Sequence, residues 1–357
     1  MAETTGTRFS AEALQQFCMQ ALLAQQVSQR DAEITAWALV SANLEGIDTH
    51  GISRLGHYIK RIQAGLVNID PQYQWTQQAP GTALLNADNS LGAPAALASV
   101  HKAVELAQTQ GIAMVAARNL NHAAALSIYA EHAAAQGCIC LMVCNTPAAM
   151  PPWGGKKAFL GTNPLAFSAP GPTDQSTPVV VDMATSLTAR GNIILAAKRG
   201  ESIPAEWATD SEGRPTTDPH AALNGGAVAP MGGAKGYALA LMIEILSATL
   251  SGADFGPHVP FPYDNWDRPT NSGLWVMAIQ THSVVSAADY AQRLGALLDE
   301  IHAAPAAEGK TIHIPGEGRF QKRADRAAHG VPVDSATLKE LQQIAEETGI
   351  VFPNSAE

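Results

Sequence analysis

The segment that decides the fold reads C-N-T-P-A-A-M-P-P-W-G-G-K-K-A-F-L-G-T-N-P-L-A-F-S-A-P-G over residues 144–171 and P-V-V-V-D-M-A-T-S-L-T-A-R-G over residues 178–191. Two short apolar runs inside it, Leu165–Ala169 and Val179–Val181, are bounded by Gly and Pro and predict buried strands. Asp182 ends the second run and leads toward a helix expected to be capped by Ser or Thr. A strand end of this kind gathers N–H groups, hydroxyls and one carboxylate, which suits a cofactor that carries phosphate and ribose. It suits an ordinary strand-to-helix turn equally well.

The composition limits the class of protein. The chain has 357 residues, which is enough for one large domain or two smaller ones. Its 22 Lys and Arg against 32 Asp and Glu give a net charge of −10, which opposes nonspecific binding to nucleic acid. The sequence contains no long uninterrupted apolar run and no N-terminal signal pattern, so we expect neither a membrane span nor secretion, and place the protein in the cytoplasm.

Four cysteines raise the question of a metal or a disulfide. They are Cys18, Cys138, Cys140 and Cys144, and the last three lie on the strand-like run C-I-C-L-M-V-C. A zinc site needs a second pair of ligands at suitable spacing, and the sequence has none. We therefore expect no metal site, and interpret these residues as buried, reduced thiols.

The N-terminal part is helical. Residues 10–45 predict two helices with N-caps at Ser10 and Ser28, and a third helix begins near Leu55. His50 lies in the loop before the third helix, with Asp48 and Thr49 as candidate caps. A helix N-terminus disfavours imidazolium and Asp48 favours it, so this histidine is either an acid/base or a structural, cap-associated residue.

The middle of the chain alternates between helices and strands. Residues 94–110 predict a helix, Ile112–Ala117 a strand, and an Ala-rich helix then extends to Gly137, which indicates an α/β layer architecture. His122 lies where that strand gives way to that helix. Two histidines in similar positions, beside Arg54 and Arg118, suggest a site that binds a carboxylate and transfers a proton. The remaining histidines considered are expected to be solvated, namely His57, His101, His132 and His220.

A second candidate for ligand binding lies at residues 230–250. Lys235 stands at the N-terminus of a helix, against the helix dipole, an arrangement that favours binding of an anion. The helix from Tyr237 to Leu250 is apolar almost all round and is expected to be buried. The pattern is not a P-loop, and no G-x-G-x-x-G follows a strand, so a standard Rossmann site is excluded.

The C-terminal part returns to helices. A strand is predicted over Gly273–Gln280, followed by a helix capped by Ser286 and a closing helix capped by Asp334. Helical ends around a mixed middle suggest that the two termini pack together as one helical domain.

Several blocks together resemble the malate/L-lactate dehydrogenase family, a group of NAD(P)-dependent oxidoreductases distinct from the Rossmann-type lactate and malate dehydrogenases. This family includes ureidoglycolate dehydrogenase, 2,3-diketogulonate reductase, sulfolactate dehydrogenase and Δ1-piperideine-2-carboxylate reductase. The blocks occur in family order across nearly the whole chain. They are D-T-H-G-I-S-R-L from Asp48, N-H at Asn121, P-W-G-G at Pro152, G-T-N-P-L-A-F at Gly161, V-D-M-A-T-S at Val181, P-T-T-D-P at Pro215 and G-G-A-K-G-Y at Gly232.

The resemblance implies a fold and an assembly. The expected fold is α/β, with a non-Rossmann cofactor domain built on a mixed sheet flanked by helices, plus a helical domain formed by both termini. We place the N-terminal helical part at residues 1–75, the NAD(P)-binding domain at 76–285 and the C-terminal helical part at 286–357. The expected assembly is an interlocked homodimer.

The resemblance also implies roles for individual residues. His50 corresponds to the proton donor/acceptor, Arg54 to the residue that holds the substrate carboxylate, and His122 to a position treated as catalytic in the ureidoglycolate enzymes. Thr146 stands where relatives often carry a cofactor-contacting Ser. Further cofactor contacts are expected at Pro178, Val179, Val180, Val181, Asp182, Met183, Ala184, Ala234, Lys235, Gly316, Glu317 and Gly318.

The implied reaction is hydride transfer between a nicotinamide, of NAD or NADP, and C2 of a small carboxylate substrate. The leading hypothesis is a 2-hydroxy acid/2-oxo acid dehydrogenase, acting on malate-, lactate- or sulfolactate-like acids. An alternative is a reductase of cyclic imine carboxylates, which the A-A-L ending of residues 122–126 favours. A third is a non-catalytic ligand-binding relative. The sequence does not decide the substrate or the choice between NAD and NADP.

Overall fold

A seven-stranded mixed sheet forms the centre of the computed structural model, which describes residues 6–173 and 175–356, with Lys198 described for its backbone alone. The strands lie in the order β2-β3-β4-β10-β5-β6-β7, and only β3 and β4 are parallel neighbours. Their bounds are β2 Gln74–Ala79, β3 Thr82–Ser90, β4 Ile112–Leu120, β5 Cys138–Cys144, β6 Leu165–Ala169, β7 Val179–Met183 and β10 Ser272–Gln280. The strands predicted at the deciding segment are thereby confirmed, as is the mixed α/β class.

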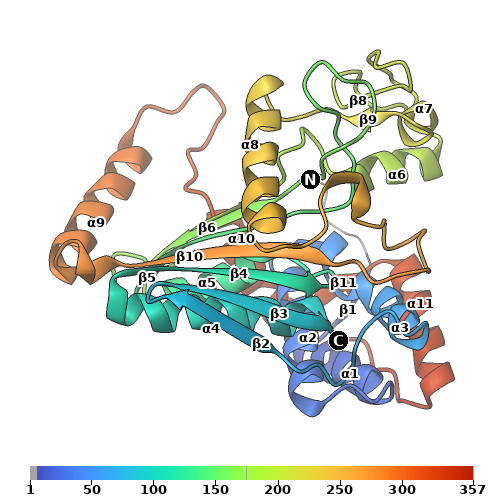
Figure 1. Ribbon diagram of the computed structural model, residues 1–357, viewed down its shortest axis with the longest axis horizontal. Coiled ribbons are helices and arrows are strands. Elements are labelled where there is room, and N and C mark those ends of the chain that lie inside the picture. Colours follow the sequence, from blue (N-terminus) through green and yellow to red (C-terminus); the bar gives the residue numbers. More distant parts are fainter. Residues whose placement is uncertain (1–5, 174, 357) are drawn as a thin grey trace.

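Helices lie on both faces of this sheet and at the two chain ends (Figure 1). Their bounds are α1 Ala11–Leu23, α2 Gln29–Leu44, α3 Leu55–Gln63, α4 Gly92–Gln110, α5 Leu126–Ala134, α6 Arg190–Arg199, α7 Pro219–Leu223, α8 Ala234–Glu244, α9 Ala287–Ala303, α10 Glu317–His329 and α11 Ser335–Thr348. Two further pairs of short strands are β1 Thr7–Phe9 with β11 Val331–Val333, and β8 Ala208–Thr209 with β9 Ala227–Val228. No described helix is long and apolar enough to cross a membrane.

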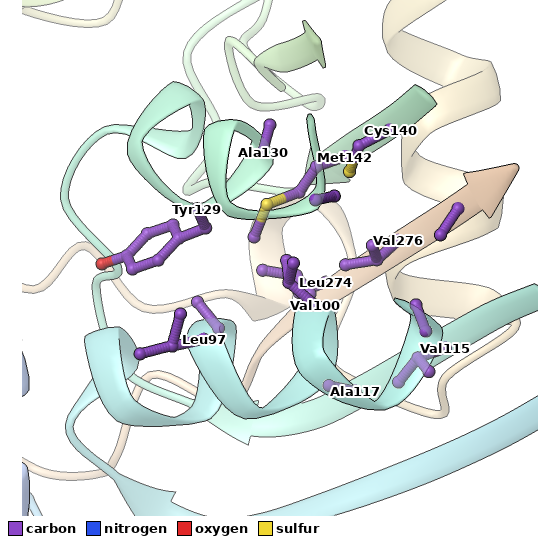
Figure 2. Close-up of a cluster of buried hydrophobic side chains, with 14 of the residues drawn as sticks. Leu97, Val100, Val115, Ala117, Tyr129, Ala130, Cys140, Met142, Leu274 and Val276 are labelled. Carbon is purple, nitrogen blue, oxygen red and sulfur yellow. The ribbon is translucent and has the colours of Figure 1, made fainter. Parts of the chain in front are cut away.

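One face of the sheet carries the largest hydrophobic core, against α4 and α5. Figure 2 shows side chains of α4 (Leu97, Val100) and α5 (Tyr129) meeting Met142 of β5 and Leu274 of β10. All of these side chains are buried. Cys138 and Cys140 belong to the same core as free thiols, and burial raises the pKa of Cys140 to about 12. Small alanines on α4 let this helix lie close to the strands.

The opposite face is covered by α8 and the π-helical turn Ile245–Thr249 that continues it. Ile243 packs there against Trp275 of β10 and Val143 of β5. The expectation that this apolar helix is buried all round was wrong. Nothing in the described chain covers the outer side of the helix and the turn, so the apolar side chains there are exposed. These are Leu241, Met242, Ile245 and Leu250.

The two chain ends share a second core. β1 pairs with β11, and residues of α1, α2 and α3 pack with Leu341 and Ile344 of α11. Phe352 adds T-shaped contacts to Phe9 and Phe17, with ring centroids 5.4 and 5.1 Å apart. The structure therefore brings the termini together, as the sequence suggested.

The helix α9 does not join that terminal core. It extends from the far end of the sheet (Figure 1, left) and has no buried residue, although it was expected within the C-terminal helical part. The hydroxyl of Tyr290 in α9 donates to the Pro170 carbonyl at 3.0 Å, and this bond holds the helix near the β6–β7 connection. The domain boundaries given above stay a prediction.

Most predicted helix starts are confirmed. The side chains of Ser10, Ser28, Ser286 and Asp334 each accept an N–H bond from the first turn of their helices. The helix after β7 is different: it begins at Arg190, no side chain caps it, and an irregular segment separates it from Asp182. The prediction of a Ser/Thr cap there was wrong.

The shared terminal core makes a stability prediction. Leu341 is 1% exposed, so Leu341→Ala should lower the free energy of unfolding by about 2–5 kcal/mol, because it leaves a cavity. Val351→Ala, at a side chain 87% exposed, is the control and should change it by less than about 0.5 kcal/mol. Urea unfolding measures both. Equal stability of the two variants would show that the C-terminal helix does not contribute to the core.

Candidate active site

The sheet directs three predicted site residues to one edge. β4, β5 and β7 point the same way in the sheet, because the strands between them are antiparallel to both neighbours. His122 follows the end of β4, Thr146 follows β5, and Asp182 lies near the end of β7. Residues far apart in sequence therefore meet at the carboxyl ends of these strands.

The loop that carries His50 is built from short 3₁₀ turns, Asp48–His50 and Ile52–Arg54. The Asn43 side chain fixes the loop: its Oδ1 accepts from Ile52 N at 2.7 Å, and its Nδ2 donates to Asp48 Oδ1 at 2.7 Å. Only glycine fits at position 51, since a Cβ there would lie 2.0 Å from Asn43 Oδ1. This close approach explains why glycine follows His50 in the D-T-H-G block.

Asp48 is not a helix cap, contrary to expectation. Neither of the two 3₁₀ turns has a side-chain cap. The carboxylate instead accepts two bonds from the buried Arg326 of α10, at 2.6 and 3.2 Å. Arg326 also donates to the Asn43 carbonyl. A guanidinium from the C-terminal part thus clamps the histidine loop of the N-terminal part.

The two histidines face each other. The ring centroids of His50 and His122 are 5.5 Å apart, with the rings tilted by 30°. Thr49 Oγ1 lies 3.0 Å from His50 Nδ1, and the Tyr58 hydroxyl lies 2.6 Å from His122 Nδ1. Each ring has a hydroxyl partner at Nδ1, so each Nε2 is left to act on a ligand.

The environment keeps both rings neutral. Burial and the nearby Arg54 lower the pKa of His50 to about 4, while the Asp182 carboxylate opposes the shift. Burial, followed by the charges of His50, Arg54 and His57, holds the pKa of His122 well below its usual value. Asp182, at the end of β7, is therefore a carboxylate that favours the charged form of His50. Both rings are therefore in the neutral form that a proton acceptor needs, although a lowered pKa makes each a weaker base than an ordinary histidine.

Arg54 joins this pair, whereas Arg118 does not. Arg54 Nε donates to the Thr49 carbonyl at 2.5 Å, and its Nη1 donates to the hydroxyl of Tyr263. Arg118 lies beside Gly252, where a Cβ would come 2.9 Å from its Nη1. The structure thus brings together one guanidinium and two imidazoles, a set that can bind a carboxylate and move a proton.

Asp182 is fixed by contacts to two helices. Its Oδ2 accepts from Ser127 N, in the first turn of α5, at 3.0 Å, and lies 3.6 Å from Arg319 Nη1 of α10. Arg319 Nη2 also donates to the Asp182 carbonyl, at 3.2 Å. The same Nη1 of Arg319 pairs with the fully buried Glu45 at 3.4 Å. The end of β7 is therefore held by α10.

The other predicted cofactor residues of β7 and α10 lie side by side. Val180 N donates to the Pro315 carbonyl at 3.1 Å, and a Cβ on Gly316 would lie 3.1 Å from that nitrogen. Glu317 pairs with His302 of α9 at 2.7 Å, so its carboxylate is already engaged. The predicted set here comprises Pro178, Val179, Val180, Val181, Met183, Ala184, Gly316, Glu317 and Gly318.

The N-terminus of α8 reaches the same edge. Met231 N, just before this helix, donates to the Thr185 carbonyl at 2.9 Å, which brings Ala234 and Lys235 near the segment after β7. Lys235 is exposed, and it makes no ion pair within the described part of the chain. Thr146 N donates to Asn163 Oδ1 at 3.1 Å, which ties the β5 end to the β6 start.

Four residues at the site were not found from the sequence. The sequence patterns did not single out Tyr58 or Tyr263. Arg319 and Arg326 were not considered, although the spacing of the arginines at 319, 323 and 326 places them on one helix face. That spacing was the available signal.

His57 was wrongly expected to be solvated. Its ring lies against Tyr263 with centroids 4.3 Å apart, and burial with Arg61, Arg54 and Lys60 nearby lowers its pKa to about 4. A small cavity behind the site is lined by His57, Tyr58, Arg61, Val67, Leu91, Asn121, His122, Pro262 and Thr270.

Comparisons with known proteins agree with this fold. The family model for malate/L-lactate dehydrogenase matches residues 9–342. L-sulfolactate dehydrogenase of Methanocaldococcus jannaschii is 37% identical over 324 residues, covering 91% of this chain and 92% of the relative. Its solved structure has a TM-score of 0.90 at 35% identity and covers 97% of this chain and 98% of that one.

Two other relatives carry different names. Ureidoglycolate dehydrogenase (NAD(+)) of Escherichia coli K12 is 34% identical over 327 residues, covering 91% of this chain and 92% of the relative. The solved structure of Δ1-piperideine-2-carboxylate reductase from Pseudomonas syringae has a TM-score of 0.85 at 30% identity, covering 95% of this chain and 99% of that one. The fold and these relatives define an enzyme of the dehydrogenase class. The chain belongs to the malate/L-lactate dehydrogenase family.

The electrostatics of the histidine pair give a second prediction. The His50 ring should titrate with a pKa of about 4 and be neutral near pH 7, which NMR of ¹⁵N-histidine-labelled protein measures. His50→Gln identifies the resonance. Asp182→Asn should lower this pKa further, because Asp182 raises it. A value at the ordinary histidine pKa of about 6.5 would contradict this picture of the site.

Proposed function

We propose that the protein is an NAD(P)-dependent oxidoreductase that interconverts a 2-hydroxy acid and a 2-oxo acid. The observation that carries the proposal is the convergence of His50, His122 and Arg54 at the sheet edge where Asp182 lies. The names of the relatives, which include sulfolactate and malate dehydrogenases, support the substrate class.

Arg54 would bind the substrate carboxylate. Its guanidinium is planar and offers a fork of N–H donors that matches the two carboxylate oxygens. Its Nε and one N–H of Nη1 already bond the Thr49 carbonyl and the Tyr263 hydroxyl, which leaves the second N–H of Nη1 and both N–H groups of Nη2 for the two carboxylate oxygens. A carboxylate bound here would place C2 of the substrate near the facing imidazoles of His50 and His122.

His50 would move the substrate proton. In oxidation, the substrate O–H bond and the C–H bond at C2 would break, neutral His50 would take the proton, and a bound oxidised nicotinamide would serve as the hydride acceptor. In reduction, protonated His50 returns the proton to the carbonyl oxygen. His122, polarised by the Tyr58 hydroxyl at 2.6 Å, would hold the same oxygen or share the proton. The negative charge of a bound substrate would raise the pKa of His50 from about 4, because a nearby anion favours the charged imidazole.

The residues at the sheet edge fit a dinucleotide. Lys235 at the N-terminus of α8 offers a positive charge and free N–H groups for a phosphate, and Asp182 offers a carboxylate. Residues 178–184 and 316–318 would form the remaining contacts, with Thr146 beside them. NAD or NADP, when bound, supplies or accepts the hydride.

A reductase of cyclic imine carboxylates is the second candidate. The sequence His122-Ala123-Ala124-Ala125-Leu126 and the structural likeness to Δ1-piperideine-2-carboxylate reductase favour it. The same Arg54 would bind the carboxylate, and the proton would go to the ring nitrogen in place of oxygen. A non-catalytic ligand-binding role is opposed by the presence together of His50, Arg54, Asp182 and Lys235.

A substrate panel tests the proposal. Purified protein is assayed with NADH and NADPH against 2-oxo acids, including sulfopyruvate and oxaloacetate, and against cyclic imine carboxylates. We expect turnover of at least one 2-oxo acid. Turnover of the imines alone would transfer the assignment to the second candidate. Absence of NAD(P)H binding by fluorescence would support the non-catalytic role.

His50→Ala should lower turnover at least about a hundredfold, the usual scale for loss of a general acid/base. Affinity for NAD(P)H, measured by fluorescence titration, should barely change, because His50 acts on the substrate. His122→Ala is the matched comparison. Full activity of His50→Ala with loss in His122→Ala would assign the acid/base role to His122.

We also propose that the protein forms a homodimer and is located in the cytoplasm. Exposed apolar side chains lie along α8 (Leu241, Met242) and along α9 (Leu297, Ile301), and a second copy of the chain would cover them. All four cysteines are free thiols, which suits a reducing compartment.

A further inference from the structure

The segment between the π-helical turn and β10 covers the substrate side of α3. It contains G-P-H-V-P-F-P-Y-D-N-W from Gly256, has little regular structure, and includes aromatic residues that reach toward the Arg54 loop. Several buried contacts hold it, among them a bond from Gly256 N to Glu244 Oε1 at 2.7 Å. The largest group of these bonds comes from one buried side chain of α3.

That side chain is Arg61, which is 2% exposed. Its Nη1 donates to the carbonyls of Pro262 and Asn265, both at 3.0 Å. Its Nη2 donates to the Arg268 carbonyl at 3.3 Å and reaches the Thr270 hydroxyl at 3.5 Å. One guanidinium therefore satisfies several backbone acceptors of the segment and fixes its path over α3.

The fixed segment presents Tyr263 to Arg54. The Tyr263 hydroxyl accepts a bond from Arg54 Nη1, and the Arg54 guanidinium carbon lies 5.2 Å from the centre of the Tyr263 ring. The ring also stacks on His57, with centroids 4.3 Å apart and planes 34° apart. Because burial and the neighbouring cations lower the pKa of His57 to about 4, the stacked imidazole adds no positive charge beside Arg54 at neutral pH.

Arg54 is consequently held from two sides before any ligand arrives. Nε is bonded to the Thr49 carbonyl at 2.5 Å and Nη1 to Tyr263, so the plane of the guanidinium is set. A free arginine loses rotamer entropy when it is ordered, and this loss would otherwise weaken substrate binding. A guanidinium that is already ordered avoids it.

We propose that Tyr263 is a positioning residue that orients Arg54 for the substrate carboxylate, and that Arg61 holds Tyr263 in place. This inference rests on the proposed function, in which Arg54 binds that carboxylate. Residues 261–270 then form a wall of the substrate site, although they lie more than 200 positions from the histidine loop in the sequence. The aromatic residues of this wall are placed to influence which 2-oxo acid fits.

Tyr263→Phe tests the proposal, because it removes the hydroxyl and keeps the ring. The variant should raise both KM for the 2-oxo acid and the Kd of oxamate, an amide analogue of such acids, by about tenfold, the scale of one charged hydrogen bond. Its kcat should stay within about twofold of the wild type, and NAD(P)H affinity should not change. Tyr263→Ala, which also removes the ring, should give a larger rise in both constants.

The matched control is Tyr290→Phe, which removes a hydroxyl from α9, away from α3 (Figure 1). It should leave KM and the oxamate Kd unchanged. An unchanged KM and Kd in Tyr263→Phe would overturn the proposal. Lowered values would overturn it too, since they would mean that the hydroxyl competes with substrate for Arg54. A wild type that neither turns over a 2-oxo acid nor binds oxamate would instead reject the proposed function.

Discussion

The rest of the site depends on ion pairs between three arginines on one face of α10 and carboxylates elsewhere in the chain. Arg326 grips Asp48 with two bonds at 2.6 and 3.2 Å, and Arg319 contacts both Asp182 and Glu45. Arg323 pairs with Glu45 and with Glu131, whose pKa is raised to about 7 by burial and the Glu45 charge. Glu45 is fully buried, so removing its arginine partners would leave a buried charge unpaired and would destabilise the fold.

This face of α10 explains why the chain ends lie together. Asp48 precedes His50 by two residues, and Asp182 lies at the end of β7, so one helix locates both the imidazole loop and the predicted cofactor strand. The terminal core of α1, α2, α3 and α11 supports the loop from behind. The sheet supplies the remaining residues by directing β4, β5 and β7 to one edge. The geometry of the site is thus a consequence of contacts between both termini and the middle of the chain.

Local patterns predicted much of the fold, and long-range pairs account for the failures. The strand Leu165–Ala169 and the caps at Ser10 and Ser28 follow from neighbours in the sequence, and they were found. The partner of Asp48 lies 278 residues away, so the carboxylate was misread as a cap. The outer face of α8 was misjudged because an apolar helix pattern does not reveal whether its cover comes from the same chain. His50 and Arg54 were named as site residues, but Tyr263 was not, since only the packing of Arg61 places it there.

The most direct test of this account is a crystal structure of the protein with NAD(P)H and oxamate. We expect the nicotinamide to lie beside residues 182–184 at the sheet edge and the oxamate carboxylate to bind Arg54. We also expect the oxamate carbonyl oxygen to lie within hydrogen-bond distance of His50 or His122. A nicotinamide bound away from the end of β7, or an oxamate held by another basic residue far from both imidazoles, would contradict this account.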